Sequence, residues 1–138
     1  MALVLDTGPI VALLDASDPA HKRCVAMVEE VGEDLVVPAP VLVEVNYWLV
    51  KLYGAAPWQT FVEDIANGAY RLYHLDESDL VRTAEIESKY ESLDLGLVDA
   101  GVMVTCERLR EPKVATLDRR DFAVVRPAHC DSLTLLPD

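Results

Sequence analysis

Short runs rich in β-forming residues alternate along this chain with stretches that repeat apolar residues at helical spacing, and this alternation constrains the fold more than any other feature. Five runs are typical of strands: Ala2–Leu5, Leu35–Val37, Tyr70–Leu75, Lys113–Leu117 and Ser132–Leu136. The segments between them are typical of helices: Pro9–Asp15, His21–Val31, Pro40–Gly54, Pro57–Ala66, Asp79–Glu91 and Asp99–Leu109. Parallel neighbouring strands require such helical crossovers, so the pattern predicts an α/β fold with a mainly parallel central sheet of about five strands, sandwiched by helices.

The composition is that of one globular domain. A chain of 138 residues, 51% of them hydrophobic, can bury a sizeable core, and no repeat or low-complexity linker divides it. We therefore expect a single domain that spans residues 1–138. The apolar stretches are far shorter than the ~20 residues of a membrane span, and no secretory signal is recognisable, so we expect a cytoplasmic protein with no membrane partner.

The charge is acidic but unevenly distributed. With 24 acidic and 12 basic residues, the formal net charge is −12, which repels a polyanion unless cations or a local basic patch intervene. Half of the basic residues fall between Arg108 and Arg126. A solvated surface explains such a cluster equally well when it is considered alone.

Four carboxylates stand at positions that require an explanation. In an open parallel sheet, ligands bind beyond the carboxyl ends of the strands, where the strand order reverses. Asp6 and Asp118 each follow a predicted strand, and they come close together if these two strands are neighbours at that reversal. Glu44 lies at the edge of a helix face that should meet the sheet, and Asp99 opens a helix. Each also has a structural explanation: water contact for Glu44, the helix dipole for Asp99, a turn for Asp118.

Together, the four carboxylates indicate a metal site. Like charges that converge on one cleft destabilise one another unless a cation neutralises them. Oxygen ligands suit Mg²⁺ or Mn²⁺, and two such ions held by shared carboxylates can activate water for phosphoryl transfer. The ions would offset the negative charge where a polyanion approaches, and Arg119 and Arg120 would bind the flanking phosphates.

The segments that carry these acids resemble the motifs of PIN-domain nucleases, in particular the VapC toxins of bacterial toxin–antitoxin pairs. The segments are VLDTGPIVALLD, PVLVEVNYWL, LGLVDAGVMVTCERL and VATLDRRDF, and they follow the order of the family over nearly the whole chain. The resemblance implies a PIN-like sandwich, a Mg²⁺- or Mn²⁺-dependent endoribonuclease activity on RNA, a homodimer, and inhibition by a VapB-type antitoxin protein.

The same resemblance assigns roles to individual residues. Asp6 and Asp99 match the principal metal ligands of the family, Glu44 matches the glutamate of its helical motif, and Asp118 matches the fourth acid. Asp121 can share the metal role of Asp118 or replace it. Two hydroxyl residues match positions that add a metal or substrate contact: Thr7 and Thr116.

Other functions fit the sequence less well. Asp-Thr-Gly, which begins at Asp6, is also the signature of aspartic proteases, but their active site needs two such loops on a β-rich scaffold, and this chain has one. A phosphatase or phosphotransferase with an aspartyl nucleophile would usually carry a second aspartate where this chain has Gly8. A catalytically decayed interaction module is disfavoured because all four acids are present.

The aromatic residues do not reveal which RNA is cleaved. Tyr47, Tyr53 and Trp58 can stack on bases, but core packing or a dimer interface explains them better. Trp48 and Leu52 belong to the apolar stripe of the Pro40–Gly54 helix, and we expect this stripe to pack against the sheet.

Overall fold

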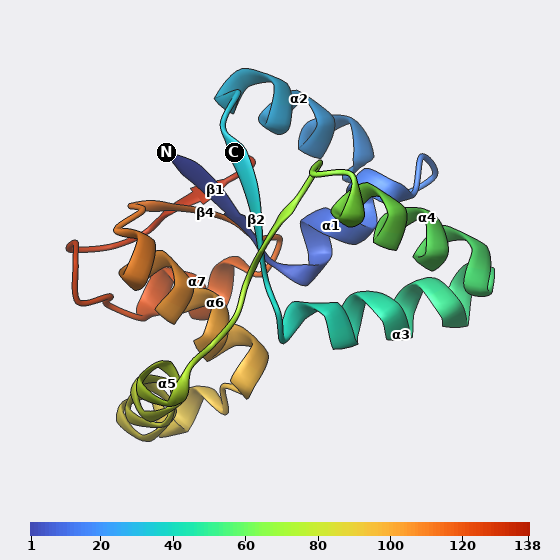
Figure 1. The fold of residues 1–138 in the computed structure, drawn as a ribbon. Coiled ribbons are helices and arrows are strands. Elements are labelled where there is room, and N and C mark those ends of the chain that lie inside the picture. Colours follow the sequence, from blue (N-terminus) through green and yellow to red (C-terminus); the bar gives the residue numbers. More distant parts are fainter.

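The computed structural model, which describes all 138 residues, contains one five-stranded sheet with helices against both of its faces (Figure 1). The strands are β1 (Ala2–Leu5), β2 (Asp34–Pro38), β3 (Arg71–Tyr73), β4 (Lys113–Ala115) and β5 (Thr134–Leu136). Their order is β3-β2-β1-β4-β5, and every neighbouring pair is parallel. The predicted α/β class is confirmed, and so is the expected pairing of the first strand with the strand that begins at Lys113.

Seven α-helices and one short 3₁₀ helix connect the strands. They are α1 (Thr7–Leu14), α2 (His21–Val31), α3 (Val41–Tyr53), α4 (Ala55–Ala66), α5 (Glu77–Lys89), η1 (Glu91–Leu93), α6 (Leu97–Leu109) and α7 (Arg119–Val124). The chain advances from β1 to β3 and then returns past β1 to β4, so right-handed crossovers put α1 to α4 on one face and α5 to α7 on the other (Figure 1). No helix has both the length and the hydropathy that a membrane crossing requires.

The centre of the sheet is fully buried because helices cover both of its faces. All four residues of β1 are buried, which explains why this strand is a continuous apolar run rather than an alternating one. Val4 of β1 pairs with Val36 on one side and with Val114 on the other. These strands contribute to one hydrophobic cluster that extends into the helices on both faces, and this core fixes the ends of β1 and β4 side by side.

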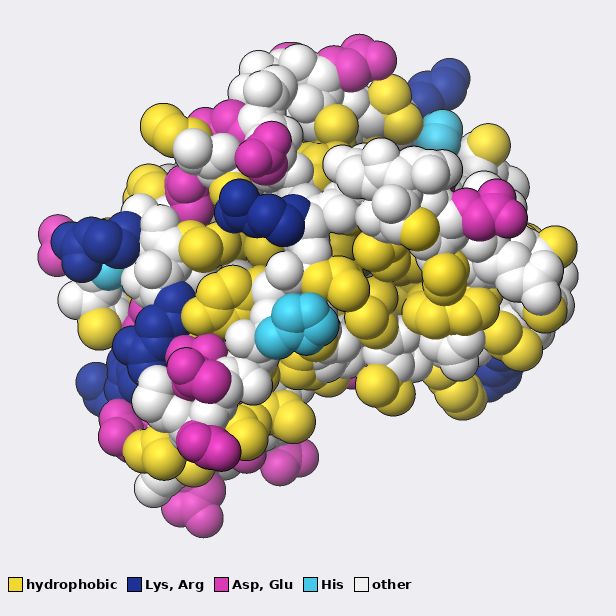
Figure 2. All heavy atoms as spheres, in the orientation of Figure 1, with side chains coloured by type: hydrophobic (Ala, Val, Ile, Leu, Met, Phe, Trp, Pro, Cys, Tyr) yellow, Lys and Arg dark blue, Asp and Glu magenta, His cyan; other side chains and the backbone are white.

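The prediction for the apolar stripe of α3 is wrong at two positions. Trp48 and Leu52 are 42% and 53% exposed, so they do not pack in the core. Only Val41, Val45 and Leu49 are buried, at a spacing of four residues, because one narrow side of α3 faces the rest of the protein. The exposed side carries apolar residues too, and Figure 2 shows hydrophobic side chains gathered over α3 and α4.

Candidate active site

The predicted acids lie at the carboxyl edge of the sheet, where the strand order reverses between β1 and β4. Asp6 follows β1 and is the N-cap of α1, and Asp118 occupies the same position before α7. Glu44 and Asp99 lie in the first turns of α3 and α6. Each of the four carboxylates is therefore placed at a helix N-terminus, where the helix dipole partly offsets its negative charge.

Thr116 connects the two strand ends. Its hydroxyl is fully buried, donates a hydrogen bond to Oδ2 of Asp6 over 2.9 Å, and accepts one from the backbone N–H of Asp118 over 3.0 Å. The second oxygen of Asp6, Oδ1, accepts from the backbone N–H of Thr7 over 2.8 Å. Both carboxylate oxygens of Asp6 are thus held by groups of the protein, which fixes the direction in which this side chain points.

The Asp-Thr-Gly triplet has a separate structural reason at each position. Asp6 caps α1, and the hydroxyl of Thr7 donates a hydrogen bond of 2.6 Å to Oε1 of Glu44. At Gly8, a Cβ atom would lie 3.2 Å from Cδ1 of Leu117, so the first turn of α1 passes too close to Leu117 for a larger residue to fit without displacing it. The triplet therefore serves one compact site and not a protease dyad.

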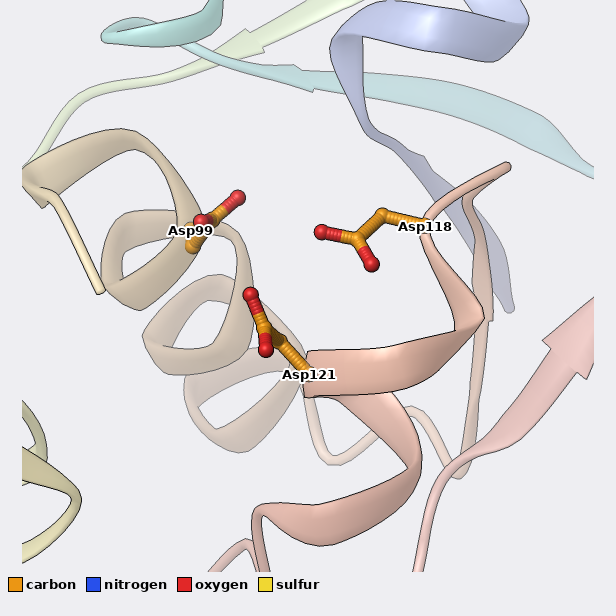
Figure 3. Close-up of side chains that lie close together, drawn as sticks. All are labelled: Asp99, Asp118 and Asp121. Atoms are coloured by element: carbon orange, nitrogen blue, oxygen red, sulfur yellow. The ribbon is translucent and has the colours of Figure 1, made fainter. Parts of the chain in front are cut away.

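Asp99, Asp118 and Asp121 point toward one another from α6, from the end of the β4–α7 loop and from α7 (Figure 3). One oxygen of each lies within 4.8 Å of the others. Asp121 is 7% exposed, and its buried Oδ1 has no hydrogen-bond donor. The nearest cation to this atom is Nε of the exposed Arg120, at 3.5 Å and without hydrogen-bond geometry. Three convergent carboxylates, one with an unpartnered buried oxygen, form a donor set that fits a hard divalent cation.

Burial, and then the proximity of the other acids, raises the pKa values of Asp99 and Asp6. The pKa of Asp99 is raised to about 7, first because the group is partly buried and then because Asp6, Asp118, Glu44 and Asp121 are negatively charged neighbours. Burial also raises the pKa of Asp6, although the hydrogen bonds from Thr7 and Thr116 act in the opposite direction. The site is therefore strongly electronegative and favours any cation that enters it.

A cavity of about 380 Å³ opens onto these acids. One wall carries the predicted residues Asp6, Thr7, Glu44, Asp99 and Asp118. The apolar part of the lining, here called the apolar wall, consists of Val11, Trp48, Leu52 and Leu117, and the remaining lining residues are Gly8 and Asp18. Asp121 and Thr116 are buried and do not line the cavity.

The sequence-based prediction missed the apolar wall and Asp18. Trp48 and Leu52 had been assigned to the core, because the helical period alone does not show how wide the buried face of α3 is. Asp18 lies in the turn before α2, and its Oδ1 accepts from the backbone N–H of Ala20 over 2.8 Å. This hydrogen bond gives Asp18 a structural role, and no motif in the sequence had indicated that it lines the cavity.

The basic cluster of the sequence divides into separate groups. Arg108 forms an ion pair with the buried Asp79, and Lys113 with Glu33 and Glu111, so both serve structural contacts. Arg119 donates a hydrogen bond to the backbone carbonyl of Pro137. The side chain of Arg120 is 85% exposed next to the acids. No arginine or lysine lines the cavity, and Arg119 and Arg120 are near its acids only through their position directly after Asp118.

Comparisons with known proteins agree with this architecture. The sequence profile of the PIN domain matches residues 3–126. Ribonuclease VapC26 of Mycobacterium tuberculosis is 28% identical over 135 residues, which are 98% of this chain and 100% of the relative. The structure of VapC20, a sarcin-ricin loop cleaving toxin of M. tuberculosis, superposes with a TM-score of 0.78 at 15% identity, over 86% of this chain and 91% of that one. A toxin–antitoxin complex from Klebsiella pneumoniae gives 0.68 at 17% identity, over 89% and 92%. At these identities the two structures establish a common fold.

Proposed function

Because this chain belongs to the PIN domain family, we propose that it is a metal-dependent endoribonuclease and acts as the toxin of a toxin–antitoxin pair in the cytoplasm. The observation that carries the proposal is the convergence of Asp6, Glu44, Asp99 and Asp118 on one cavity at the switch point of the sheet. The ribonuclease name of the relative VapC26, which this chain matches along its whole length, supports RNA as the substrate.

The acids fit Mg²⁺ or Mn²⁺, with Asp6 and Asp99 as the proposed principal ligands and Asp118 or Asp121 completing the site. When bound, such an ion would activate water and stabilise the charge that develops on the phosphodiester. Asp121 is the better supported of the two additional ligands, because its buried Oδ1 receives no hydrogen bond.

The remaining residues position these ligands and the substrate. Thr116 holds Asp6 in one orientation, and Thr7 does the same for Glu44. We propose that Glu44, at the cavity wall, accepts a proton from the attacking water, and that Arg119 and Arg120 bind phosphates on either side of the scissile bond. The acids would hold the metal ion, while the arginines would supply positive charge that attracts RNA to a chain with a net charge of −12.

Substituting the proposed ligands tests this function. Asp6→Asn and Asp99→Asn keep the shape of each side chain while removing charge, so each should abolish cleavage of cellular RNA while the protein stays folded. Asp34→Asn is the matched control, because this exposed aspartate at the start of β2 lies at the opposite edge of the sheet. Sequencing of RNA 5′ ends after induction would identify the cleaved sites. Cleavage that persists in excess EDTA would refute the metal mechanism.

We also propose two protein partners. The first is a VapB-type antitoxin, and the toxin–antitoxin complex among the structures of the same fold supports it. The second is another copy of this chain, because α3 exposes large apolar side chains beyond the cavity, such as Val43 and Val50, which are 72% and 43% exposed. Light scattering during gel filtration would distinguish a homodimer from a monomer.

A further inference from the structure

Trp48 joins the proposed catalytic acids to the apolar wall of the cavity. It lies one helical turn after Glu44 on α3, so the two side chains are neighbours on the same face of the helix. The residue remains 42% exposed, although tryptophan has a large apolar ring that is usually buried. Leu52, one further turn along α3, extends the same wall.

The indole ring is held in place by residues of its own helix. The ring of Tyr47 meets it edge to face, with 5.2 Å between the centroids and 85° between the planes. Nζ of Lys51 lies 5.4 Å from the centre of the Trp48 ring and donates a hydrogen bond of 3.2 Å to the hydroxyl of Tyr47. These contacts preorganise an aromatic surface and put a positive charge beside the indole ring.

These observations rest on the proposed nuclease function, and from them we propose that Trp48 stacks on one base of the RNA next to the scissile phosphate. A scissile phosphate positioned beside the acids carries a nucleoside on each side, and the apolar wall of the same cavity is within reach of one of them. A volume of about 380 Å³ is in the range of small-ligand sites and admits a nucleotide but no folded protein.

Stacking on Trp48 requires an unpaired base. A base in a duplex is already stacked on both sides, so only an unpaired base can turn into the cavity and lie against the indole. Aromatic stacking tolerates all four bases because each has a π face. Only an unpaired base can therefore make this stack, and we infer that Lys51 contacts a phosphate of the same strand.

Kinetic measurements on Trp48 variants test the proposal. Trp48→Ala should raise KM for a short single-stranded RNA by about 5- to 150-fold, the range found for the loss of one stacked base, with kcat largely kept. Trp48→Phe keeps a π face, so its KM should stay near the wild-type value, whereas the KM of Trp48→Leu should rise as it does for Trp48→Ala. Val62→Ala is the matched control, because this residue of α4 is equally exposed and does not line the cavity.

Abasic substrates identify the stacked nucleotide. Removing the base at one position of the RNA should raise KM as much as Trp48→Ala does. When the variant is tested on that abasic RNA, the two increases should not add. Fluorescence gives a second readout, because the chain has 2 tryptophans and Trp58→Phe leaves Trp48 as the only one. RNA should then quench the emission, and the abasic RNA should not.

Two results would overturn the proposal. One is a KM for Trp48→Ala that lies within twofold of the wild-type value. The other is an increase in KM that is the same for every abasic position, together with a Trp48→Phe variant whose KM stays as high as that of Trp48→Ala. This result would assign Trp48 a structural or partner-binding role. A wild-type protein that cleaves no RNA would instead refute the nuclease function itself, so failure of the two proposals can be distinguished.

Discussion

Asp99 is a proposed metal ligand, and its protonation also affects the stability of the fold. Its carboxylate lies among four other acids, and its pKa is raised to about 7. In the unfolded chain the same group ionises near pH 4. Without a cation, the folded protein therefore binds a proton at Asp99 over a pH range in which the unfolded chain does not.

This difference predicts how stability changes with pH in the absence of metal. The raised pKa stabilises the fold fully below about pH 4, and this contribution is lost as the pH rises through 7. Asp99→Asn removes the titrating group, so in EDTA its stability relative to the wild type should rise between pH 4.5 and pH 8, by on the order of 1–2 kcal/mol after solvent screening is allowed for. Urea unfolding at several pH values measures it. Parallel pH profiles for the two proteins would contradict the prediction.

The arginines after Asp118 give a second prediction at this scale. If Arg119 and Arg120 bind phosphates of single-stranded RNA, replacing both with Ala should lower the slope of log affinity against log salt concentration by about 1–2. Arg71→Ala is the control, because this exposed arginine begins β3 at the distant edge of the sheet. A slope that stays unchanged in the double variant would leave the two side chains as part of a solvated surface.

Individual site residues were predictable to different degrees. Asp6 and Asp118 could be predicted from the sequence, because a strand end followed by an acid is a local pattern and parallel pairing brings the two strand ends together. Thr116 and Thr7 could be predicted only through the family resemblance, because their hydrogen bonds connect segments far apart in sequence. Trp48 was assigned to the wrong side of its helix, because its exposure depends on packing that no short pattern encodes.

At the scale of elements, α5 and α6 are joined by ion pairs. Glu107 of α6 accepts two hydrogen bonds of 2.9 Å from the guanidinium of Arg82 on α5, and a third from the backbone N–H of Ala128. Arg108 of α6 similarly pairs with the buried Asp79 of α5. Since α6 carries Asp99 in its first turn, these contacts help to position Asp99 at the carboxyl edge of the sheet.

The pairing predicts an unequal effect of two substitutions around Arg82. Glu107→Ala removes a buried carboxylate and leaves the Ala128 N–H and a partly buried guanidinium without their partner, so unfolding should become easier by about 2–3 kcal/mol. Glu85→Ala removes the exposed partner of the same arginine and should cost less than about 0.5 kcal/mol. Thermal or urea unfolding compares them. Equal losses would show that burial does not set the strength of these pairs.

The elements themselves were largely predictable, and the exceptions have local causes. The α5 helix was expected to start at Asp79, but it begins at Glu77, because Asp76 caps it in a capping box with Asp79. In that box an aspartate takes the position that glutamate or glutamine usually occupies. The α7 helix, Arg119–Val124, was not predicted, because its six residues are too few to show a helical period.

At the scale of the whole molecule, charge governs both the substrate and the proposed inhibitor. The carboxylates that line the cavity are complementary to a partner that inserts a cation among them. A guanidinium suits this role, because its planar fork pairs with a carboxylate such as Glu44 or Asp99 and competes with the metal. The exposed apolar side chains of α3 would bind the rest of an extended or helical segment of the antitoxin.

This arrangement predicts that a tail of the antitoxin, and not its DNA-binding part, inhibits cleavage. Truncating the tail should restore ribonuclease activity while the DNA-binding part stays folded. The measurement is RNA cleavage at a fixed ratio of the two proteins, with the full-length antitoxin as the control. Full inhibition by a tail-less antitoxin, or bound antitoxin that leaves Mn²⁺ affinity and cleavage unaffected, would exclude this mechanism.

The strand order has a consequence for how the protein is made. β1 precedes β2 and β3 in the sequence, yet its neighbour β4 follows both, so the central pairing cannot form until β4 has been synthesised. Asp118 and Asp121 emerge from the ribosome after that strand. A nascent chain that is still being extended carries Asp6, Glu44 and Asp99 but cannot bring them together at a completed edge. The ribosome that makes this protein is therefore not exposed to the assembled candidate site until β4 and α7 have been synthesised.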